Sequence, residues 1–155
     1  MRRVLVARGG ALSPFSGLGG SHARFVNLLS SGDFRDYSLT DILEYPEAGN
    51  SLTRAYRRWS SHPKRVAKAA RKGHAQILHI TDQEQAHLVP KNCPIPVVVF
   101  VHDMFHLAPT IVDSGKEMVE VGDHNPSRLR KYDMGKLRKG LSRANLFICN
   151  SPSTA

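Results

Sequence analysis

The sequence predicts an α/β domain of the Rossmann-like kind, a three-layer sandwich with a mainly parallel sheet. Short apolar strand-like segments alternate with helix-like segments along the whole chain. The clearest strand, residues 96–101, is an unbroken apolar run rich in valine. Such a run is typical of a parallel strand that helices cover on both faces. With 155 residues, 41% of them hydrophobic, the chain suits one domain with one core.

The first half of the chain supplies two strands and a helix in order. Residues 4–7 are a short buried strand, and a glycine-rich loop follows from Gly9-Gly10 to Gly19-Gly20. Apolar residues at helical spacing predict a helix over 21–29 that stops at Gly32. Residues 37–40 are a weak second strand.

The middle of the chain predicts a helix in two pieces over residues 50–73, the second piece starting at Pro63. Residues 76–80 are the next strand, and 84–89 a helical turn. The first helical piece is expected to bury one face, formed by Leu52, Ala55, Tyr56 and Trp59.

A long loop over residues 104–125, acidic in its middle, follows the strand at 96–101. A basic helix is expected over 126–141 and a last strand over 145–149. Ser151-Pro152 then has the pattern of a helix start, a serine N-cap with proline at the first position. We therefore expect the chain to end at the start of a helix. The inner face of the basic helix is expected to consist of Leu129, Tyr132, Leu137 and Leu141.

The charge of the chain favours anionic partners. Its formal net charge is +9, and eight basic residues and no acid lie between Ala48 and Thr81. We expect either a surface for anionic lipid or a phosphorylated acceptor, or a solvated helix face. Tyr56 and Trp59 fall at core-facing positions, so no specific nucleic acid is expected. The expected surface patch consists of Arg54, Arg57, Arg58, Lys64, Arg65 and Lys68.

The composition favours a cytoplasmic protein, with peripheral contact at the inner membrane face left open by the basic segment. No apolar run approaches the ~20 residues that cross a membrane. The apolar stretch at the N-terminus is too short for a signal peptide. Cys93 and Cys149 show no metal-type spacing, so free thiols are expected.

Parallel strands open all their carboxyl-terminal loops at one edge of the sheet, where ligands bind. We expect four segments at this ligand edge. They are Gly17-Leu18-Gly19-Gly20, Thr81-Asp82, His102-Asp103 and Asn150-Ser151.

The glycine-rich segment before a helix favours phosphate, because N–H groups and the helix dipole point at an anion there. The alternative is a loop that uses glycine for tight turning. A nicotinamide fingerprint fits less well, since His22 takes its sixth place, although Asp41 could serve as the ribose acid. The Gly-Lys-Ser/Thr of a Walker loop is missing.

His102-Asp103 follows a buried strand, where polar groups are costly unless they are paired or face a cleft. The pattern favours a histidine at a reaction centre, and the alternative is a histidine that caps the strand end. A metal site with His106, His79, Asp82 or His87 matches no specific ligand spacing, so no metal is predicted.

In combination these segments resemble the N-terminal domain of GT-B glycosyltransferases, of the retaining family 4 type. The resemblance covers nearly the whole chain. It rests on Val4-Leu5-Val6, Gly17-Leu18-Gly19-Gly20-Ser21-His22, Phe25-Val26-Asn27-Leu28-Leu29, Ile77-Leu78-His79-Ile80, Val97-Val98-Val99-Phe100-Val101-His102-Asp103 and Arg143-Ala144-Asn145-Leu146-Phe147-Ile148-Cys149-Asn150-Ser151.

The resemblance implies sugar transfer with retention, from a UDP- or GDP-sugar co-substrate to a glycan, lipid or phosphorylated acceptor, with no covalently bound cofactor. It implies that His102, supported by Asp103, lies near the transferred sugar, and that Gly17, Gly19 and Gly20 approach the donor diphosphate. The acceptor side of the ligand edge would hold Ser21, His22, Thr81, Asp82, His106 and Ser151.

The resemblance also implies that the donor-binding C-terminal domain is absent from this chain, which would be inactive alone. The loop at 104–125 is the hypothetical acceptor-binding segment. The alternative function is a stand-alone Rossmann-like module that binds a nucleotide or an anionic lipid or nucleic-acid partner.

Overall fold

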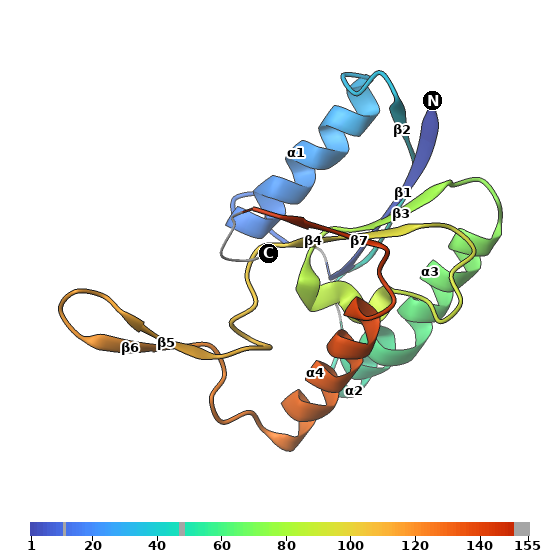
Figure 1. Cartoon of the computed structure of the whole chain (residues 1–155). Coiled ribbons are helices and arrows are strands. Elements are labelled where there is room, and N and C mark those ends of the chain that lie inside the picture. The colour runs from blue at the N-terminus through green and yellow to red at the C-terminus, as the bar shows by residue number, and fades with distance from the viewer. Residues whose placement is uncertain (11, 47–48, 151–155) are drawn as a thin grey trace.

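The computed structural model describes residues 1–10, 12–46 and 49–150. Five strands form one sheet in the order β2-β1-β3-β4-β7, and every neighbouring pair is parallel (Figure 1). The predicted Rossmann-like α/β fold is confirmed. The strands are β1 (Arg2–Gly10), β2 (Tyr37–Tyr45), β3 (Ile77–Ile80), β4 (Val97–Val101) and β7 (Leu146–Cys149).

Helices lie on both faces of this sheet (Figure 1). Helix α1 (Gly17–Ser31) packs on one face, where Leu29 meets Val4 and Val6. The other face carries the larger group of helical elements. These are α2 (Ser51–Tyr56), the π-helical turn η1 (Arg57–Ser61), α3 (His62–Arg71), the 3-10 helix η2 (Gln83–Leu88) and α4 (Arg128–Leu141).

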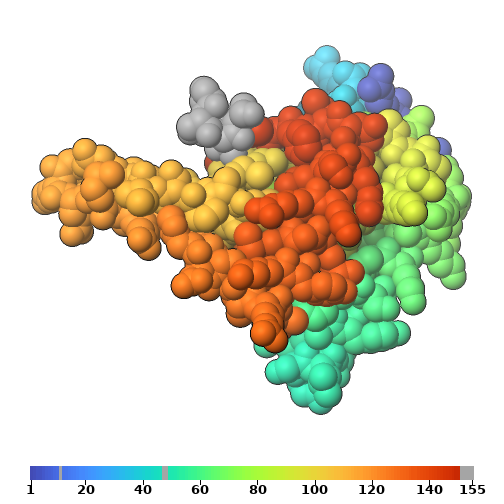
Figure 2. All heavy atoms as spheres, turned by 60° about the horizontal axis from the view of Figure 1, so that its bottom comes forward, coloured from blue at the N-terminus to red at the C-terminus, as the bar shows by residue number. Residues whose placement is uncertain are grey.

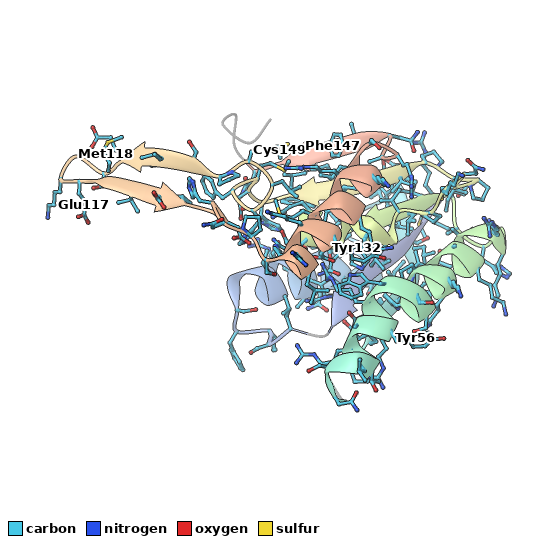
Figure 3. All side chains as sticks on the ribbon, turned by 90° about the horizontal axis from the view of Figure 1, so that it is seen from below. Tyr56, Glu117, Met118, Tyr132, Phe147 and Cys149 are labelled. Atoms are coloured by element: carbon cyan, nitrogen blue, oxygen red, sulfur yellow. The ribbon has the colours of Figure 1, made fainter. Side chains whose placement is uncertain are left out.

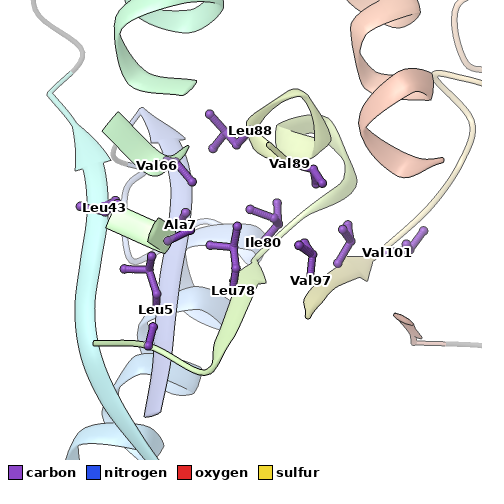
Figure 4. Packing of buried hydrophobic residues seen from close by; sticks show 13 residues of the cluster. Leu5, Ala7, Leu43, Val66, Leu78, Ile80, Leu88, Val89, Val97 and Val101 are labelled. Atoms are coloured by element: carbon purple, nitrogen blue, oxygen red, sulfur yellow. The ribbon is translucent and has the colours of Figure 1, made fainter. Parts of the chain in front are cut away.

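The main core lies between the sheet and the α3 side. Alternate residues of one strand point to opposite faces, so Leu5 and Ala7 of β1 face this core while Val4 and Val6 face α1. Val66 of α3 and Leu88 of η2 close the core from outside (Figure 4).

Several elements are longer than the sequence predicts. Strand β1 continues to Gly10, so Gly9-Gly10 belongs to the strand and not to the loop. Strand β2 extends to Tyr45 because it pairs with β1 along its length. Helix α1 begins at Gly17, where the Ser16 hydroxyl caps it, and ends at Gly32 with φ 81°, as expected.

The expectation of a loop over residues 104–125 is wrong in its centre. Strands β5 (Thr110–Asp113) and β6 (Met118–Val121) form an antiparallel hairpin there. Gly115, with φ 78°, supplies the left-handed position of its turn. The hairpin stands out from the body of the domain (Figures 1 and 2), with Glu117 and Met118 at its outer end (Figure 3).

Two expected inner faces are partly wrong. Leu52 and Tyr56 are 81% and 61% exposed, whereas Ala55 and Trp59 of the same expected face are half-buried. Leu129 and Tyr132 of α4 are also exposed, because α4 turns Asp133, Met134 and Leu137 inward. The expectation holds for Leu137, which is fully buried, and Leu141 packs against the core.

The face that carries α1 is only partly covered by the described residues. An open apolar groove of about 540 Å³ runs from Phe25 and Leu29 of α1 to Ile148 of β7. Strand β7 is an edge strand, and its Leu146 is 56% exposed. This face therefore leaves apolar side chains of α1 and of the sheet open to solvent.

Gly140 of α4 is the position where the helix approaches η2 most closely. A Cβ at Gly140 would collide with the Ala86 carbonyl of η2. We expect Gly140→Ala to lower the free energy of unfolding by about 1–3 kcal/mol in urea titrations. The matched control is Gly135→Ala in the same helix, where a Cβ meets nothing within 4 Å. It should stabilise by up to about 1 kcal/mol. Equal effects of the two substitutions would contradict the close contact.

Candidate functional site

The carboxyl ends of β1, β3 and β4 meet at one edge of the sheet. The Thr81 amide donates to the Ala7 carbonyl (3.4 Å), and the His102 amide donates to the Gln83 side chain (2.9 Å). Electrostatic interactions link Asp82 to both Arg8 and His102. The parallel topology thus brings together the ends of strands that lie far apart in the sequence.

Two histidines lie behind this edge: His79 of β3 is buried, and His22 of α1 is half-buried. Phe25 stacks on His79 with 4.3 Å between ring centroids. Burial lowers the pKa of both imidazoles to about 4, helped by Arg8 beside His22 and by His22 beside His79. Both rings are therefore neutral at pH 7 and available as hydrogen-bond partners.

Asp82 is a buried carboxyl group at the start of η2. Its side chain is shielded from water, and Oδ1 has no hydrogen-bond partner among the described residues. Burial raises the pKa of this carboxyl group, against the opposing effect of an amide hydrogen bond from Glu84. A carboxyl group in this state can exchange a proton nearer to neutral pH than an exposed aspartate can.

His102 is half-buried at the end of β4, with its ring 4.6 Å from the ring of Phe100. Its amide, not its ring, is held by Gln83. Asp103 accepts from the Phe105 amide (3.3 Å) and so shapes the turn. No hydrogen bond joins Asp103 to His102 in the described part of the chain. His106 is exposed two residues beyond Met104.

The glycines of the expected phosphate loop belong to the first turn of α1. Ser16 Oγ accepts from the Gly19 amide (3.1 Å), and the Gly20 amide donates to the Ser16 carbonyl (2.7 Å). A Cβ at Gly19 would collide with the Ser13 carbonyl, so this glycine is needed for packing. The amides of Gly17 and Leu18 are first-turn groups without an intrahelical acceptor.

The remaining residues that were expected at the ligand edge differ in their exposure to solvent. Thr81 is buried next to Asp82, and Ser21 is exposed on α1. Ser151 and the helix start at Ser151-Pro152 lie outside the described residues.

The basic segment is only partly a surface patch. Arg54, Lys64, Arg65 and Lys68 are exposed, although Arg65 also donates to the Glu44 carbonyl. Arg57 is half-buried and donates to the Pro46 carbonyl.

Arg58 departs furthest from the expectation of a surface residue. Its guanidinium pairs with the Asp133 carboxylate at 2.8 Å, and the Asp133 side chain is only 8% exposed. The Trp59 indole donates to the same carboxylate (2.8 Å). Arg130 of α4 binds both Asp133 and Glu84 of η2. This polar cluster ties η1, η2 and α4 together, and Asp133 lies on a face where only apolar residues were expected.

The sequence interpretation missed Arg8. This residue follows four apolar residues of β1 and is only 4% exposed. It lines a cavity of about 440 Å³ beside the first turn of α1. Its signal was present in the sequence, because a charged group at the end of a buried strand is the pattern that singled out His102.

No group of three or more histidine, cysteine or acidic side chains within the described ranges has a geometry that could hold a metal ion. No helix among those elements combines the length and apolarity of a membrane span.

Comparison of the chain with protein families, with curated proteins and with solved structures finds no match.

The buried histidines make stability depend on pH. Unfolded His79 takes up a proton near its ordinary pKa of 6.5, whereas folded His79 excludes it until about pH 4. Acidification from pH 7 to 5 therefore favours the unfolded chain, by on the order of 2 kcal/mol for this residue. The free energy of unfolding of the wild type should therefore fall between pH 7 and pH 5. We expect His79→Phe to remove the share of this fall that is due to His79, as measured by urea titrations at the two pH values. His74→Gln, at an exposed loop position, is the matched control and should keep it. An unchanged pH dependence in His79→Phe would contradict the assignment.

Proposed function

We propose that this chain forms the acceptor-side part of a nucleotide-sugar-dependent glycosyltransferase that retains the configuration of the transferred sugar. The observation that carries the proposal is the set of polar groups at the carboxyl edge of the sheet. Asp82 interacts electrostatically with both Arg8 and His102, and Asp82 and Arg8 line the cavity beside the first turn of α1. Ligands of open α/β sheets bind at this edge.

The expected reaction breaks the bond between the sugar's anomeric carbon and the diphosphate, and forms a bond from that carbon to an acceptor oxygen. The acceptor hydroxyl loses its proton, and the diphosphate leaves with the bonding electrons. The first-turn amides of Gly17 and Leu18, at the positive end of α1, would stabilise the departing diphosphate.

The site geometry refines the roles that the resemblance implies. Gly19 and Gly20 already use their amides inside the helix cap, so their role is to allow close approach of the chain. His102 has a ring free of intramolecular hydrogen bonds among the described residues, and it would contact the transferred sugar. Asp103 would support it by fixing the turn that follows β4.

The hairpin β5-β6 supports an acceptor role for the segment after His102. It departs from the same edge and extends away from the domain (Figure 2). Its side chains Ile111, Val112 and Met118 are exposed, which suits contact with an apolar or amphipathic acceptor. We propose a cytoplasmic enzyme that works at the inner membrane face.

A second candidate function is the binding of an anionic surface without catalysis. The observation that favours it is a cavity of about 390 Å³ rimmed by Lys131, Lys136, Lys139 and Arg143. These cations belong to α4 and the residues after it, apart from the carboxyl edge. Binding to anionic vesicles in the absence of any transferase activity would favour this candidate over the enzyme.

The test of the enzyme is release of nucleoside diphosphate from UDP- and GDP-sugars by the protein as its gene encodes it. We expect His102→Ala to lower turnover by about 100-fold, in the range of a group that acts on the reacting atoms. Because His102 is half-buried and its ring makes no hydrogen bond to any described residue, the thermal unfolding midpoint should stay nearly unchanged.

The matched control for this test is His74→Ala, an exposed histidine in the turn after α3. It should retain wild-type turnover. Equal turnover of His102→Ala and wild type would remove His102 from the active site, and no release by the wild type from either donor class would reject the enzyme.

A further inference from the structure

Arg8 is a buried cation without a partner. The residue is 4% exposed, and its Nε has no hydrogen-bond acceptor. Among the described residues, no ion pair within 4.0 Å and no side-chain hydrogen bond involves its guanidinium group. Its backbone carbonyl accepts a hydrogen bond from the His62 ring (2.6 Å). The guanidinium Nε is therefore buried and unsatisfied, and the side chain lines an open cavity.

A buried guanidinium is costly to leave unpaired. Arginine cannot lose its charge to escape burial, since it stays protonated in proteins. Burying an ion without a counter-charge costs several kcal/mol in general. A position of this kind indicates that the counter-charge comes from outside the chain.

The neighbouring arginines Arg58 and Arg130, in contrast, have acidic partners. Arg58 is neutralised by Asp133, and Arg130 by Glu84 and Asp133. Both acidic residues are used in those pairs. Arg8 lies near these ion pairs, but neither Asp133 nor Glu84 forms an ion pair with it.

The carboxyl group of Asp82 interacts electrostatically with Arg8. The two side chains nevertheless form no ion pair within 4.0 Å. Burial raises the pKa of Asp82, and its Oδ1 has no partner. The two groups thus face the same space from β1 and η2 without closing on each other. A ligand group between them could bind Arg8 and hydrogen-bond to Asp82.

The space in front of Arg8 is a cavity of about 440 Å³, within the usual range for small-molecule sites. Its walls combine polar and aromatic groups. Tyr45 and Trp59 contribute rings, and Leu18 comes from the first turn of α1. Arg54 lines the same cavity, is exposed, and has no ion pair among the described residues.

We propose that this cavity binds the phosphate group of a small phosphorylated ligand, with Arg8 as its principal contact and Arg54 as the second cation. Two arginines without carboxylate partners match the double charge of a phosphate monoester. The planar fork of Arg8 suits bidentate contact with two phosphate oxygens. Tyr45 and Trp59 would contact the uncharged part of the ligand. This inference holds whether or not the chain takes part in sugar transfer.

The test measures the thermal unfolding midpoint of the 155-residue chain with inorganic phosphate, and with acetate and chloride at the same ionic strength. We expect phosphate to raise the midpoint in a saturable way, well above the effect of either other salt. A phosphate effect no larger than that of chloride would overturn the site. An equal effect of acetate would overturn its assignment to phosphate.

Two substitutions at Arg8 test whether the rise of the unfolding midpoint with phosphate comes from binding at this residue. Arg8→Met should abolish the phosphate shift and raise the midpoint without phosphate, because it removes an uncompensated buried charge. Arg8→Lys keeps the charge but loses the fork, and should weaken phosphate binding about tenfold or more.

Arg24→Met, at an exposed position of α1, is the matched control and should keep the full phosphate shift. A full phosphate shift in either Arg8 variant would overturn the proposal. If Arg8→Met fails to fold, Arg8→Lys still decides between the two outcomes.

Discussion

All five strands of the main sheet run in the same direction, so each delivers its carboxyl end to one edge. The polar groups of the proposed site depend on this constraint. β1 brings Arg8 to the edge, β3 brings Asp82, and β4 brings His102. The face of the sheet toward α3 is apolar because its strands carry valine, leucine and isoleucine there (Figure 4). Arg8, Asp82 and His102 thus lie at the carboxyl edge, whereas the buried Asp133 pairs with Arg58 between the helices.

The distribution of negative charge decides which cations are free to bind. The chain has 22 basic and 13 acidic residues, so acids are scarce. Asp133 and Glu84 are committed to Arg58 and Arg130, and these pairs hold η1, η2 and α4 together. The fold needs those acids for cohesion between helices, and Arg8 is left with its charge uncompensated. Arg58 and Arg130 therefore hold the helical elements together, whereas Arg8 is the arginine proposed to bind a ligand.

Much of the fold could be predicted, because strand alternation and the valine run of β4 depend only on local pattern. The hairpin β5-β6 could not be, since its strands are short and pair only with each other. The buried face of α4 was mispredicted because an ion pair over long sequence distance decides that Asp133 points inward. Arg8 follows a run of buried strand residues, as His102 does, but its own burial without an ion pair among the described residues depends on long-range packing that the local pattern does not contain.

The most direct measurement of the binding edge is an NMR titration that follows the side-chain Nε–H signals of the arginines during addition of phosphate. We expect the Arg8 signal to shift and saturate, together with amide signals of the first turn of α1 and of Asp82, while the Arg24 signal stays in place. A signal of Arg8 that does not respond would contradict the central claim. Shifts spread evenly and without saturation over the exposed arginines Arg65 and Arg71 of α3 would contradict it as well.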